Sequence, residues 1–389
     1  MISVEEALTQ CLALAAPLSP EIVPLAQAAG RWMCAPAVAT RDQPPFAASA
    51  MDGYAVQGNP IPGDSFLVVG EAGAGHAFTG TLGKGEALRI FTGAPVPEDA
   101  TRVIIQEDVD RSGDVITLRT GADSGTHIRP RGQDFRAGDR LGPRRLRPAD
   151  LALLAAMNIP AVTVTRRPVV ALIATGDELV MPGEDPRSDQ IIASNSFALK
   201  AMVEAEGGEA RLLPIARDTE AELATVLALA EGADLIVTIG GASVGDHDLV
   251  GRVAGLERTF WKIAMRPGKP LIAGRLNGVP MLGLPGNPVS AIVCGHLFLL
   301  PMVRAMLGDP APAPKTRQAR LAVDLPANGP RTHYMRARLS PGDGMPEIAP
   351  FDRQDSALLS ILGQADALLI RPVADSPRGA GSTVFYLPL

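Results

Sequence analysis

The spacing of apolar and polar residues changes character along the chain. Ser3 followed by Glu6 is a capping-box pattern, and the apolar residues after it predict a helix over residues 4–16. Over residues 44–120, glycine and proline separate short β-branched runs, which is typical of a small all-β module. A second helix is predicted over residues 148–157, since proline is favoured in the first helical turn. These patterns predict a β-module inserted into a helical scaffold.

Near-continuous apolar runs begin after Pro168. VVALIAT, EARLLPIA and ADLIVTIG are apolar over most of their length, as expected of strands buried on both faces. Helices are predicted between them over residues 195–206 and 219–231, and a capping box from Thr219 to Glu222 opens the second. This alternation predicts right-handed parallel βαβ units in a doubly wound sheet, with ligands bound at the carboxyl ends of the strands.

The last third of the chain contains one long apolar stretch and then returns to short strands. The stretch over residues 289–303 is broken by His296 and Pro301, and it is shorter than the roughly 20 residues that span a bilayer. It therefore predicts a buried helix. After Pro310, runs such as QARLAVDL and STVFYLPL alternate with glycine and proline turns, which predicts a separate C-terminal β-module.

The fold class predicted for these 389 residues is α/β plus β modules, in several domains. The predicted boundaries are 1–45 and 137–166 for a discontinuous helical domain, 46–136 for the inserted β-domain, 167–310 for the central doubly wound α/β domain, and 311–389 for the C-terminal β-domain.

Composition narrows the classes of function. Lysine and arginine number 36 against 42 acidic residues, and this net charge of −6 argues against a general nucleic-acid or membrane-surface binder. The three cysteines lack C-x-x-C spacing, so neither a disulfide framework nor a structural zinc site is expected. The opening MISVEEALTQ has two glutamates where an export signal needs a basic segment. We therefore expect a cytoplasmic protein.

Three strands of the α/β region end in unusual loops: ATGDEL at residues 174–179, IGGASVGDHD at 239–248 and GLPGNPVS at 283–290. The carboxyl ends of parallel strands meet at one edge, so these loops should line one rim. Glycines at a strand-to-helix turn expose backbone N–H groups that can hold a phosphate. A tight turn without a ligand is the alternative. The candidate cradle consists of Gly240, Gly241, Ser243 and Gly245.

Acidic and basic residues surround this candidate cradle. Asp177, Glu178, Asp246 and Asp248 supply carboxylates with which a divalent cation, Mg²⁺ by preference, could bridge to phosphate oxygens. The alternative for Asp246 and Asp248 is helix capping. In RPGKP, Arg266 and Lys269 lie on a backbone stiffened by two prolines, which suits an anion smaller than a nucleotide.

Other motifs leave further possibilities open. In LPGNPVS, Pro288 would begin a helix with Ser290 in its first turn, where free amides and a hydroxyl can complete an anion site. Asp52 in SAMDGYA and Thr92 in FTGAPVP could reach a site if the β-module packs over the rim. G-x-S-x-G around Ser243 is also the nucleophile-elbow pattern of hydrolases, for which the later histidines are poorly placed.

Eight motifs occur together and in order: PPFAASAMDGYA, IFTGAPVP, IRPRGQDF, ATGDEL, SNSFAL, GGASVGDHD, RPGKP and LPGNPVS. In this the chain resembles the molybdopterin molybdenumtransferases of the MoeA type, which are similar to the E domain of gephyrin. The resemblance implies insertion of molybdate into adenylylated molybdopterin, with Mg²⁺-dependent release of AMP, to form molybdenum cofactor. A molybdopterin adenylyltransferase and a non-catalytic pterin-binding scaffold are the alternatives.

The resemblance also assigns site residues. The catalytic positions it implies are Asp52, Thr92, Asp134 and Glu178, and the metal ligands are Glu178, Asp246 and Asp248. The molybdopterin-binding positions are Gly240, Gly241, Ser243, Gly245, Asp248, Pro285 and Pro288. The molybdate positions are Ser243, Arg266, Lys269, Pro270, Ser290, Arg336 and Ser356.

The fold implied by the resemblance is an elongated four-domain homodimer. Its α/β domain binds molybdopterin, its C-terminal domain is a β-barrel, and its cleft lies between the α/β domain of one subunit and the β-domain of the other. Other molybdenum cofactor biosynthesis proteins are possible partners, whereas nucleic acid and membrane are not expected.

Overall fold

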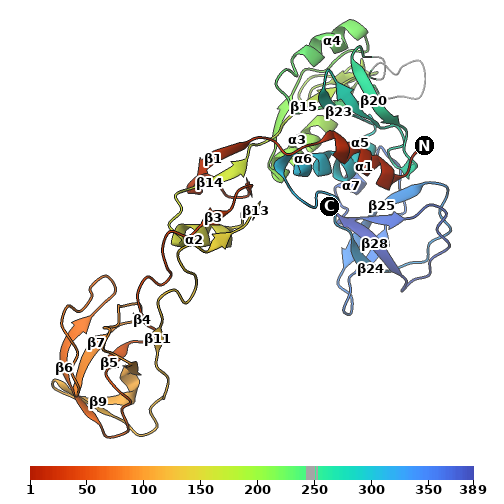
Figure 1. Cartoon of the computed structure of the whole chain (residues 1–389). Helices are drawn as coiled ribbons and strands as arrows, with labels where there is room; N and C mark the ends of the chain where they lie inside the picture. Colours follow the sequence, from red (N-terminus) through yellow and green to blue (C-terminus); the bar gives the residue numbers. More distant parts are fainter. Residues whose placement is uncertain (242–249, 251–252) are drawn as a thin grey trace. The chain divides into compact units, whose positions relative to one another are not determined.

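The computed structural model describes residues 1–241, 250 and 253–389. The chain forms two compact units, which we call the α/β unit (residues 1–21 and 165–389) and the β unit (residues 22–164). Each unit has hydrophobic clusters of its own. Figure 1 shows the helices and strands of both units. The division into four domains given above remains a prediction.

The β unit contains the β-module expected from the sequence. Its main sheet has the strand order β8-β5-β7-β6-β10-β9, in which the pairs are antiparallel except for β6 with β7. Apolar side chains such as Tyr54, Val56 and Ile116 alternate inward and form its core. These strands are β5 (Gly53–Val56), β6 (Ser65–Ala72), β7 (Glu86–Ile90), β8 (Arg102–Ile105), β9 (Val109–Ser112) and β10 (Val115–Leu118).

A second layer of the β unit surrounds helix α2 (Pro148–Ala156). The helix begins at the predicted proline, and the buried Asp150 carboxylate accepts hydrogen bonds from the Arg147 backbone and side chain. Its neighbouring sheet has the order β1-β14-β2-β13. The remaining short elements of the β unit, in chain order, are β1 (Pro20–Pro24), η1 (Leu25–Gln27), β2 (Trp32–Met33), β3 (Ala37–Val38), β4 (Ala48–Ser49), η2 (Gln106–Asp108), β11 (Ile128–Arg129), β12 (Arg140–Leu141), β13 (Arg144–Arg145) and β14 (Ala161–Thr165).

The α/β unit is built on a sheet with the order β18-β15-β19-β23-β22-β20. The first four strands are parallel, which confirms the predicted βαβ pattern, while β22 and β20 run antiparallel at one edge. Asn277 and Gly278 both have positive φ and form the tight β22–β23 turn, a hairpin that was not predicted. The strands are β15 (Val169–Ala174), β18 (Glu209–Leu212), β19 (Leu235–Ile239), β20 (Leu256–Trp261), β22 (Ile272–Leu276) and β23 (Val279–Leu284).

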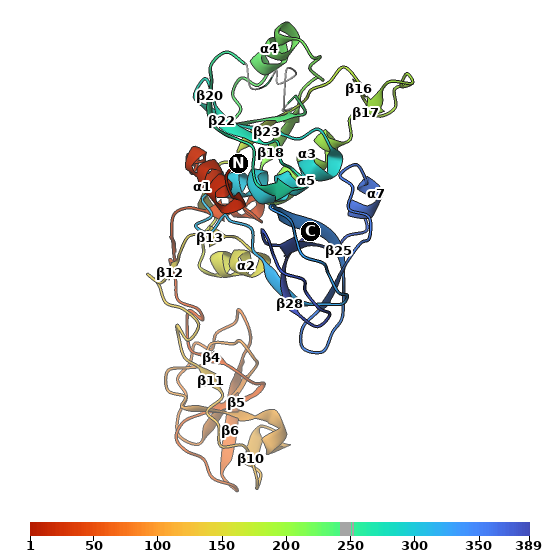
Figure 2. The ribbon, with the colours of Figure 1, turned by 90° about the vertical axis from the view of Figure 1, so that its right-hand side faces the viewer.

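Helices cover both faces of this sheet. Helix α4 (Glu220–Ala228) lies on one face, and α1 (Val4–Leu14), α3 (Asn195–Glu206) and α5 (Pro288–Cys294) lie on the other (Figure 1, Figure 2). Both predicted capping boxes have their first hydrogen bond, from Glu6 N to Ser3 Oγ and from Glu222 N to Thr219 Oγ1. Helix α1 ends two residues earlier than predicted, because Pro17 disfavours helical backbone in the residue before it.

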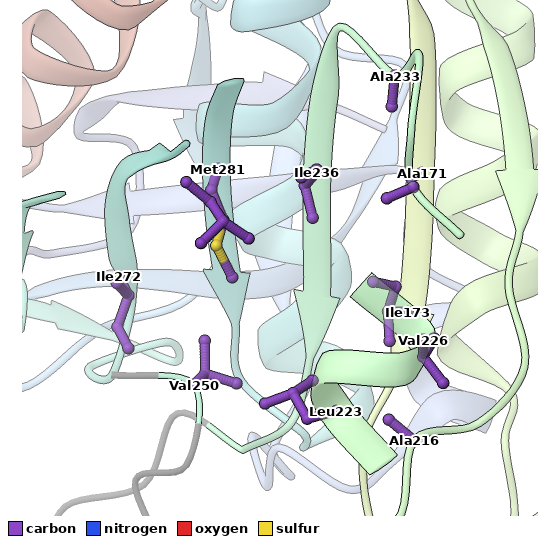
Figure 3. Packing of buried hydrophobic residues seen from close by; sticks show 12 residues of the cluster. Ala171, Ile173, Ala216, Leu223, Val226, Ala233, Ile236, Val250, Ile272 and Met281 are labelled. Carbon is purple, nitrogen blue, oxygen red and sulfur yellow. The ribbon is translucent and has the colours of Figure 1, made fainter. Parts of the chain in front are cut away.

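The apolar side chains of α4 and of the sheet form one hydrophobic core. Figure 3 shows Leu223 and Val226 of α4 among side chains from the strands, including Ile173, Ile236 and Ile272. All five are buried. This packing fixes the parallel strands, and therefore the loops that follow their carboxyl ends.

The apolar stretch forms one long interrupted helix. It comprises α5, a π-helical turn η4 (Gly295–Leu299) and α6 (Leu300–Leu307), and Pro301, which lacks an N–H, follows the π turn. Among the described residues, only residues 288–307 form a helix long and apolar enough to cross a membrane, and 78% of that window is buried inside the protein. The predicted buried helix is confirmed.

The C-terminal residues form a closed β-barrel. Its strands follow the order β25-β26-β24-β28-β27, and β25 also pairs with β27 and closes the barrel. Strand β21 joins β25 in parallel and links the barrel to the segment before β22. The remaining elements are β16 (Leu179–Val180), β17 (Ile191–Ile192), β21 (Met265–Arg266), β24 (Arg317–Leu321), β25 (Thr332–Ser340), β26 (Glu347–Pro350), α7 (Leu359–Leu362), β27 (Ala367–Arg371) and β28 (Thr383–Pro388).

Candidate functional site

A cavity of about 620 Å³ lies at the carboxyl ends of β15, β19 and β23. The three loops expected to share a rim all contribute described residues to it, which confirms that expectation for the described part of each loop. From the predicted site, the lining contains Glu178, Gly240, Gly241, Pro270, Pro285 and Pro288. Further lining residues are Thr175, Gly176, Ile191, Ile192, Ser194, Asn195, Ser196, Asp218, Gly286, Asn287 and Ala357.

Glycine is required directly after β19, where the chain passes close to Thr175 at the end of β15. Gly240 has φ +93°, and a Cβ there would lie 2.6 Å from the Thr175 carbonyl oxygen. Gly241 has φ +64°, and its Cβ would lie 2.8 Å from Thr175 Oγ1. Side chains are therefore excluded, and the backbone itself forms this wall of the cavity.

Two helices begin at the cavity. Helix α3 begins at Asn195, and α5 begins at Pro288, directly after the lining residue Asn287. The Asn195 side-chain amide donates to the Gly286 carbonyl oxygen at 2.7 Å and so joins the two helix starts. Helix N-termini carry partial positive charge and free N–H groups, which favour a phosphate.

Glu178 lies in a loop that is held from the neighbouring segment. The guanidinium Nη1 of Arg217 donates to the carbonyl oxygens of Asp177 and Leu179, each at 3.0 Å, and the Asp177 carboxylate accepts from the Asp218 backbone at 3.0 Å. The Glu178 side chain is exposed and lines the cavity. The backbone on both sides of this carboxylate is thus fixed while the carboxylate remains accessible.

The RPGKP segment has a fixed backbone beside the barrel. The Lys269 carbonyl oxygen accepts from the Ile263 backbone at 3.0 Å, and Arg266 pairs with His333 where β21 meets β25. Gly268 has φ +104°, and a Cβ there would lie 2.5 Å from Cys294 Sγ. Pro270 reaches the cavity lining, whereas the side chains of Arg266 and Lys269 are not part of it.

Arg336 lies on strand β25 of the barrel and is 1% exposed. Its guanidinium donates to the Asp355 carbonyl oxygen at 2.6 Å and to Gln354 Oε1 at 3.1 Å. The chain continues to Ser356, whose carbonyl oxygen accepts from the backbone of Val289 in α5 at 3.0 Å. Arg336 thus holds the loop that contacts the start of α5, and its contact with molybdate stays a prediction.

A cluster of positive charge surrounds His333. Burial, and secondarily the charges of Arg266, Arg336, Arg331 and Arg371, lower the pKa of this imidazole to about 4. The histidine is therefore neutral near pH 7. Near pH 7 the imidazole therefore adds no positive charge to that of these four arginines.

The β unit contains a separate group of predicted residues. The Asp52 carboxylate Oδ1 accepts from the Thr92 backbone at 2.7 Å and from Thr92 Oγ1 at 2.8 Å. These hydrogen bonds, with the charge of Arg89, hold the pKa of Asp52 below its usual value. Asp134 lines a second cavity of about 580 Å³, together with Gly93, Arg129 and residues 43–46.

The predicted residues thus fall into three groups. Ser243, Gly245, Asp246 and Asp248 lie outside the described residues. Asp52, Thr92 and Asp134 belong to the β unit, and the others to the α/β unit. In the α/β unit, Ser290 is buried in the first turn of α5, and Ser356 directly precedes the lining residue Ala357. Within the described residues, no cluster of three potential metal ligands occurs.

Sequence reasoning did not assign roles to several residues of these sites. Asn195 was noted within SNSFAL, and its place at the start of a predicted helix was the available signal. Arg217 and Asp218 carry no local signal, because their contacts with the 176–179 loop depend on the pairing of β15 with β18. Arg89 likewise carries no local signal, because its contacts also depend on strand pairing.

Three family descriptions match consecutive parts of the chain. The MoeA N-terminal region (domain I and II) matches residues 2–158, the probable molybdopterin binding domain matches residues 171–305, and the MoeA C-terminal region (domain IV) matches residues 318–389.

Individual proteins match over the same length. The chain is 35% identical to a molybdopterin molybdenumtransferase of a Nostoc species over 387 residues, covering 95% of this chain and 88% of the relative. It is 33% identical to the enzyme of that name from Haemophilus influenzae, covering 100% and 98%. A crystal structure of the molybdopterin biosynthesis MoeA protein from Pyrococcus horikoshii superposes with a TM-score of 0.83 at 30% identity, covering 100% and 99%. By its sequence and its fold, this chain belongs to the MoeA family of molybdopterin molybdenumtransferases.

Proposed function

We propose that this protein inserts molybdate into adenylylated molybdopterin, with Mg²⁺-dependent cleavage of the phosphoanhydride and release of AMP, and so forms molybdenum cofactor. The observation that carries the proposal is the cavity of about 620 Å³ in a chain of this family, where a glycine wall, two helix starts and the Glu178 carboxylate meet. Its volume is in the range of small-molecule sites.

The cavity suits a phosphorylated pterin. The N-termini of α3 and α5 favour the phosphate end, and the backbone of Gly240 and Gly241 lets an anion approach closely. Ile191 and Ile192 add an apolar wall. The combination of an apolar wall with a few polar groups fits an aromatic heterocycle that carries phosphate.

Glu178 fits a role as a ligand of Mg²⁺. It is an exposed carboxylate at the end of a strand loop, and hard cations take oxygen ligands of this kind. Asp246 and Asp248 would complete the set in our proposal. When bound, the ion would neutralise charge on the diphosphate. The chain's own contribution is to hold the Glu178 loop through Arg217.

The RPGKP segment is proposed to hold molybdate. Lys269 and Arg266 supply positive charge on a fixed backbone, and Ser290 supplies a hydroxyl in the first turn of α5. Ser356 and Arg336 belong to the same proposal. An arginine at position 266 offers a planar set of donors to the oxyanion.

The remaining assignments concern assembly. We propose a homodimer in which Asp52, Thr92 and Asp134 of the β unit serve the cavity of the other subunit. Sedimentation analysis tests this: a dimer is expected, and a monomer at the concentrations used for activity would contradict it. A cytoplasmic location and hand-over to other cofactor biosynthesis proteins are part of the proposal.

The experiment is a reconstitution with purified protein. Adenylylated molybdopterin, Mg²⁺ and molybdate are supplied, and AMP and metal-loaded cofactor are measured. The proposal predicts both products. No AMP above the protein-free control would refute it.

Further assays separate the alternatives. An adenylyltransferase would consume ATP with unmodified molybdopterin, and a scaffold would bind the pterin tightly without turnover. A serine hydrolase would be labelled at Ser243 by a fluorophosphonate probe. The described histidines do not favour it, because His296 lies in the π turn of a core helix and His333 lies in the barrel.

A further inference from the structure

Arg89 in the β unit has its guanidinium between two aromatic rings. Its central carbon lies 5.1 Å from the centroid of the Tyr54 ring and 4.7 Å from that of Phe91. Tyr54 and Arg89 are direct partners across the antiparallel strands β5 and β7. Cation–π contact with two rings restricts the position of the guanidinium plane.

The hydrogen bonds of this guanidinium go to Gly53, the residue after Asp52, and to Gln106, which is itself bonded to Asp52. Nη1 donates to the Gly53 carbonyl oxygen at 3.2 Å, and Nη2 donates to Gln106 Oε1 at 2.6 Å. The backbone N–H of Gln106 in turn donates to the carbonyl oxygen of Asp52 at 3.1 Å. Arg89 therefore holds the backbone at Asp52 in two ways. It is bonded to Gly53, the next residue in the chain, and to Gln106, which is bonded to the Asp52 carbonyl oxygen.

The residue after Asp52 is packed closely against the neighbouring strand. Gly53 packs so closely on β8 that a Cβ there would lie 1.9 Å from the Ile104 carbonyl oxygen. The Asp52 carboxylate is committed to Thr92, which follows Arg89 by three residues. Arg89 on β7 thus faces Tyr54 on β5, and Asp52 and Thr92 lie just beyond the adjacent ends of these two strands.

We propose that Arg89 is a positioning residue of the molybdenum-transfer reaction, which holds Asp52 and Thr92 in their working arrangement through Gly53, Gln106 and the two rings. This inference rests on the proposed function. The inference extends the proposed function to Arg89, a residue that need not touch substrate. Its guanidinium donates to a backbone carbonyl oxygen and to a side-chain amide oxygen of the protein itself. The charge of Arg89 also favours the ionised form of Asp52.

Lysine cannot replace this arginine fully. An ammonium can supply charge near Asp52, but it has no planar face for two rings and cannot span both hydrogen-bond acceptors in a fixed geometry. Arg89→Lys is therefore expected to keep part of the activity, and Arg89→Met to keep less.

The test is a double-mutant cycle on the full-length protein. AMP release is measured for wild type, Arg89→Met, Asp52→Asn and the double variant, with Lys84→Met as the control. Lys84 is an exposed cation just before the start of β7, at the end of that strand opposite to Thr92. Melting temperatures show that each variant is folded, and Arg89→Lys takes the place of Arg89→Met in the cycle if the latter does not fold.

We expect kcat of Arg89→Met to fall about tenfold to a hundredfold with little change in KM, because misplacement of a catalytic group costs that much. In the Asp52→Asn background the same change should cost almost nothing. Lys84→Met should behave as wild type. An equal loss in both backgrounds, or unchanged kcat in Arg89→Met, would overturn the inference.

A second readout needs no activity. The methyl NMR signal of Thr92 in threonine-labelled protein reports on its contact with Asp52, and it should move in Arg89→Met as it does in Asp52→Asn. An unmoved signal would overturn the inference. If the wild type releases no AMP, the proposed function fails, and the Thr92 signal still decides whether Arg89 fixes this pair.

Discussion

The side-chain amide of Asn195 donates a 2.7 Å hydrogen bond to the carbonyl oxygen of Gly286. It joins the start of α3 to the turn before α5, two segments 91 residues apart in the chain. Both segments line the cavity at the carboxyl ends of the parallel strands. The spacing of the two helix starts, and so of their partial positive charges, depends on this bond.

Replacing Asn195 by alanine is expected to weaken ligand binding. The change removes one hydrogen bond, which should lower the free energy of unfolding by about 1 kcal/mol. The binding free energy for molybdopterin should fall by more than this loss in the free energy of unfolding. Urea unfolding and a binding titration check both effects. Thr225→Ala, which removes an exposed hydroxyl bonded to the Ala221 carbonyl in α4, is the control, and equal affinities for the two variants would contradict the role of Asn195.

Alanine at position 240 should be more harmful than alanine at position 232. Both glycines have positive φ, which costs an alanine about 1–2 kcal/mol. Only at Gly240 would the added Cβ also meet a backbone oxygen, that of Thr175 at 2.6 Å. Urea unfolding of Gly240→Ala and Gly232→Ala should therefore show a larger loss for the former, accompanied by loss of pterin binding. Equal unfolding curves would show that the strand end can relax.

Glu178→Gln and Asp52→Asn are expected to lower turnover without unfolding the protein. Each substitution keeps the size of the side chain and removes its charge. For a group that binds the ion or assists proton transfer, the loss in kcat should be about a hundredfold or more. AMP release and melting temperature are measured together. Wild-type rates would remove the substituted residue from the site.

Stability should fall as the pH falls from about 6.5 to about 4. The pKa of His333 is lowered to about 4 in the folded protein, against an unfolded value near 6.5, so unfolding takes up a proton in this range. The contribution of the neutral imidazole to the free energy of unfolding is complete above the pKa of the unfolded state. It is lost as the pH falls toward the pKa of the folded state. Urea unfolding of His333→Gln from pH 4 to 7 should show a shallower dependence. His76→Gln, which changes an exposed histidine, should keep the wild-type slope.

Local patterns predicted the elements that depend on local chemistry. The helix at residues 195–206 has the predicted bounds, and α2 begins at Pro148, because caps, prolines and apolar spacing act within a few residues. The rim of three loops followed from the geometry of parallel strands. The β22–β23 hairpin was not predicted, although the Asn277-Gly278 pair in its turn is a hairpin signal.

The contacts that hold the site were beyond sequence reasoning. Arg336 was assigned to molybdate from its motif position alone, and only the barrel's pairing reveals that its guanidinium is buried against the 353–355 loop. Arg89 likewise meets Gln106 because β5 pairs with both β7 and β8. Such contacts arise from long-range strand pairing, which leaves no periodic signal in the residues themselves.

The most direct test of the central claim is the rate of AMP release with and without molybdate. The purified protein is mixed with adenylylated molybdopterin and Mg²⁺, and AMP and metal-loaded cofactor are followed together in time. The account predicts that molybdate accelerates AMP release and that metal-loaded cofactor appears in equal amount. AMP release at the protein-free rate, or release with no metal-loaded cofactor, would contradict it.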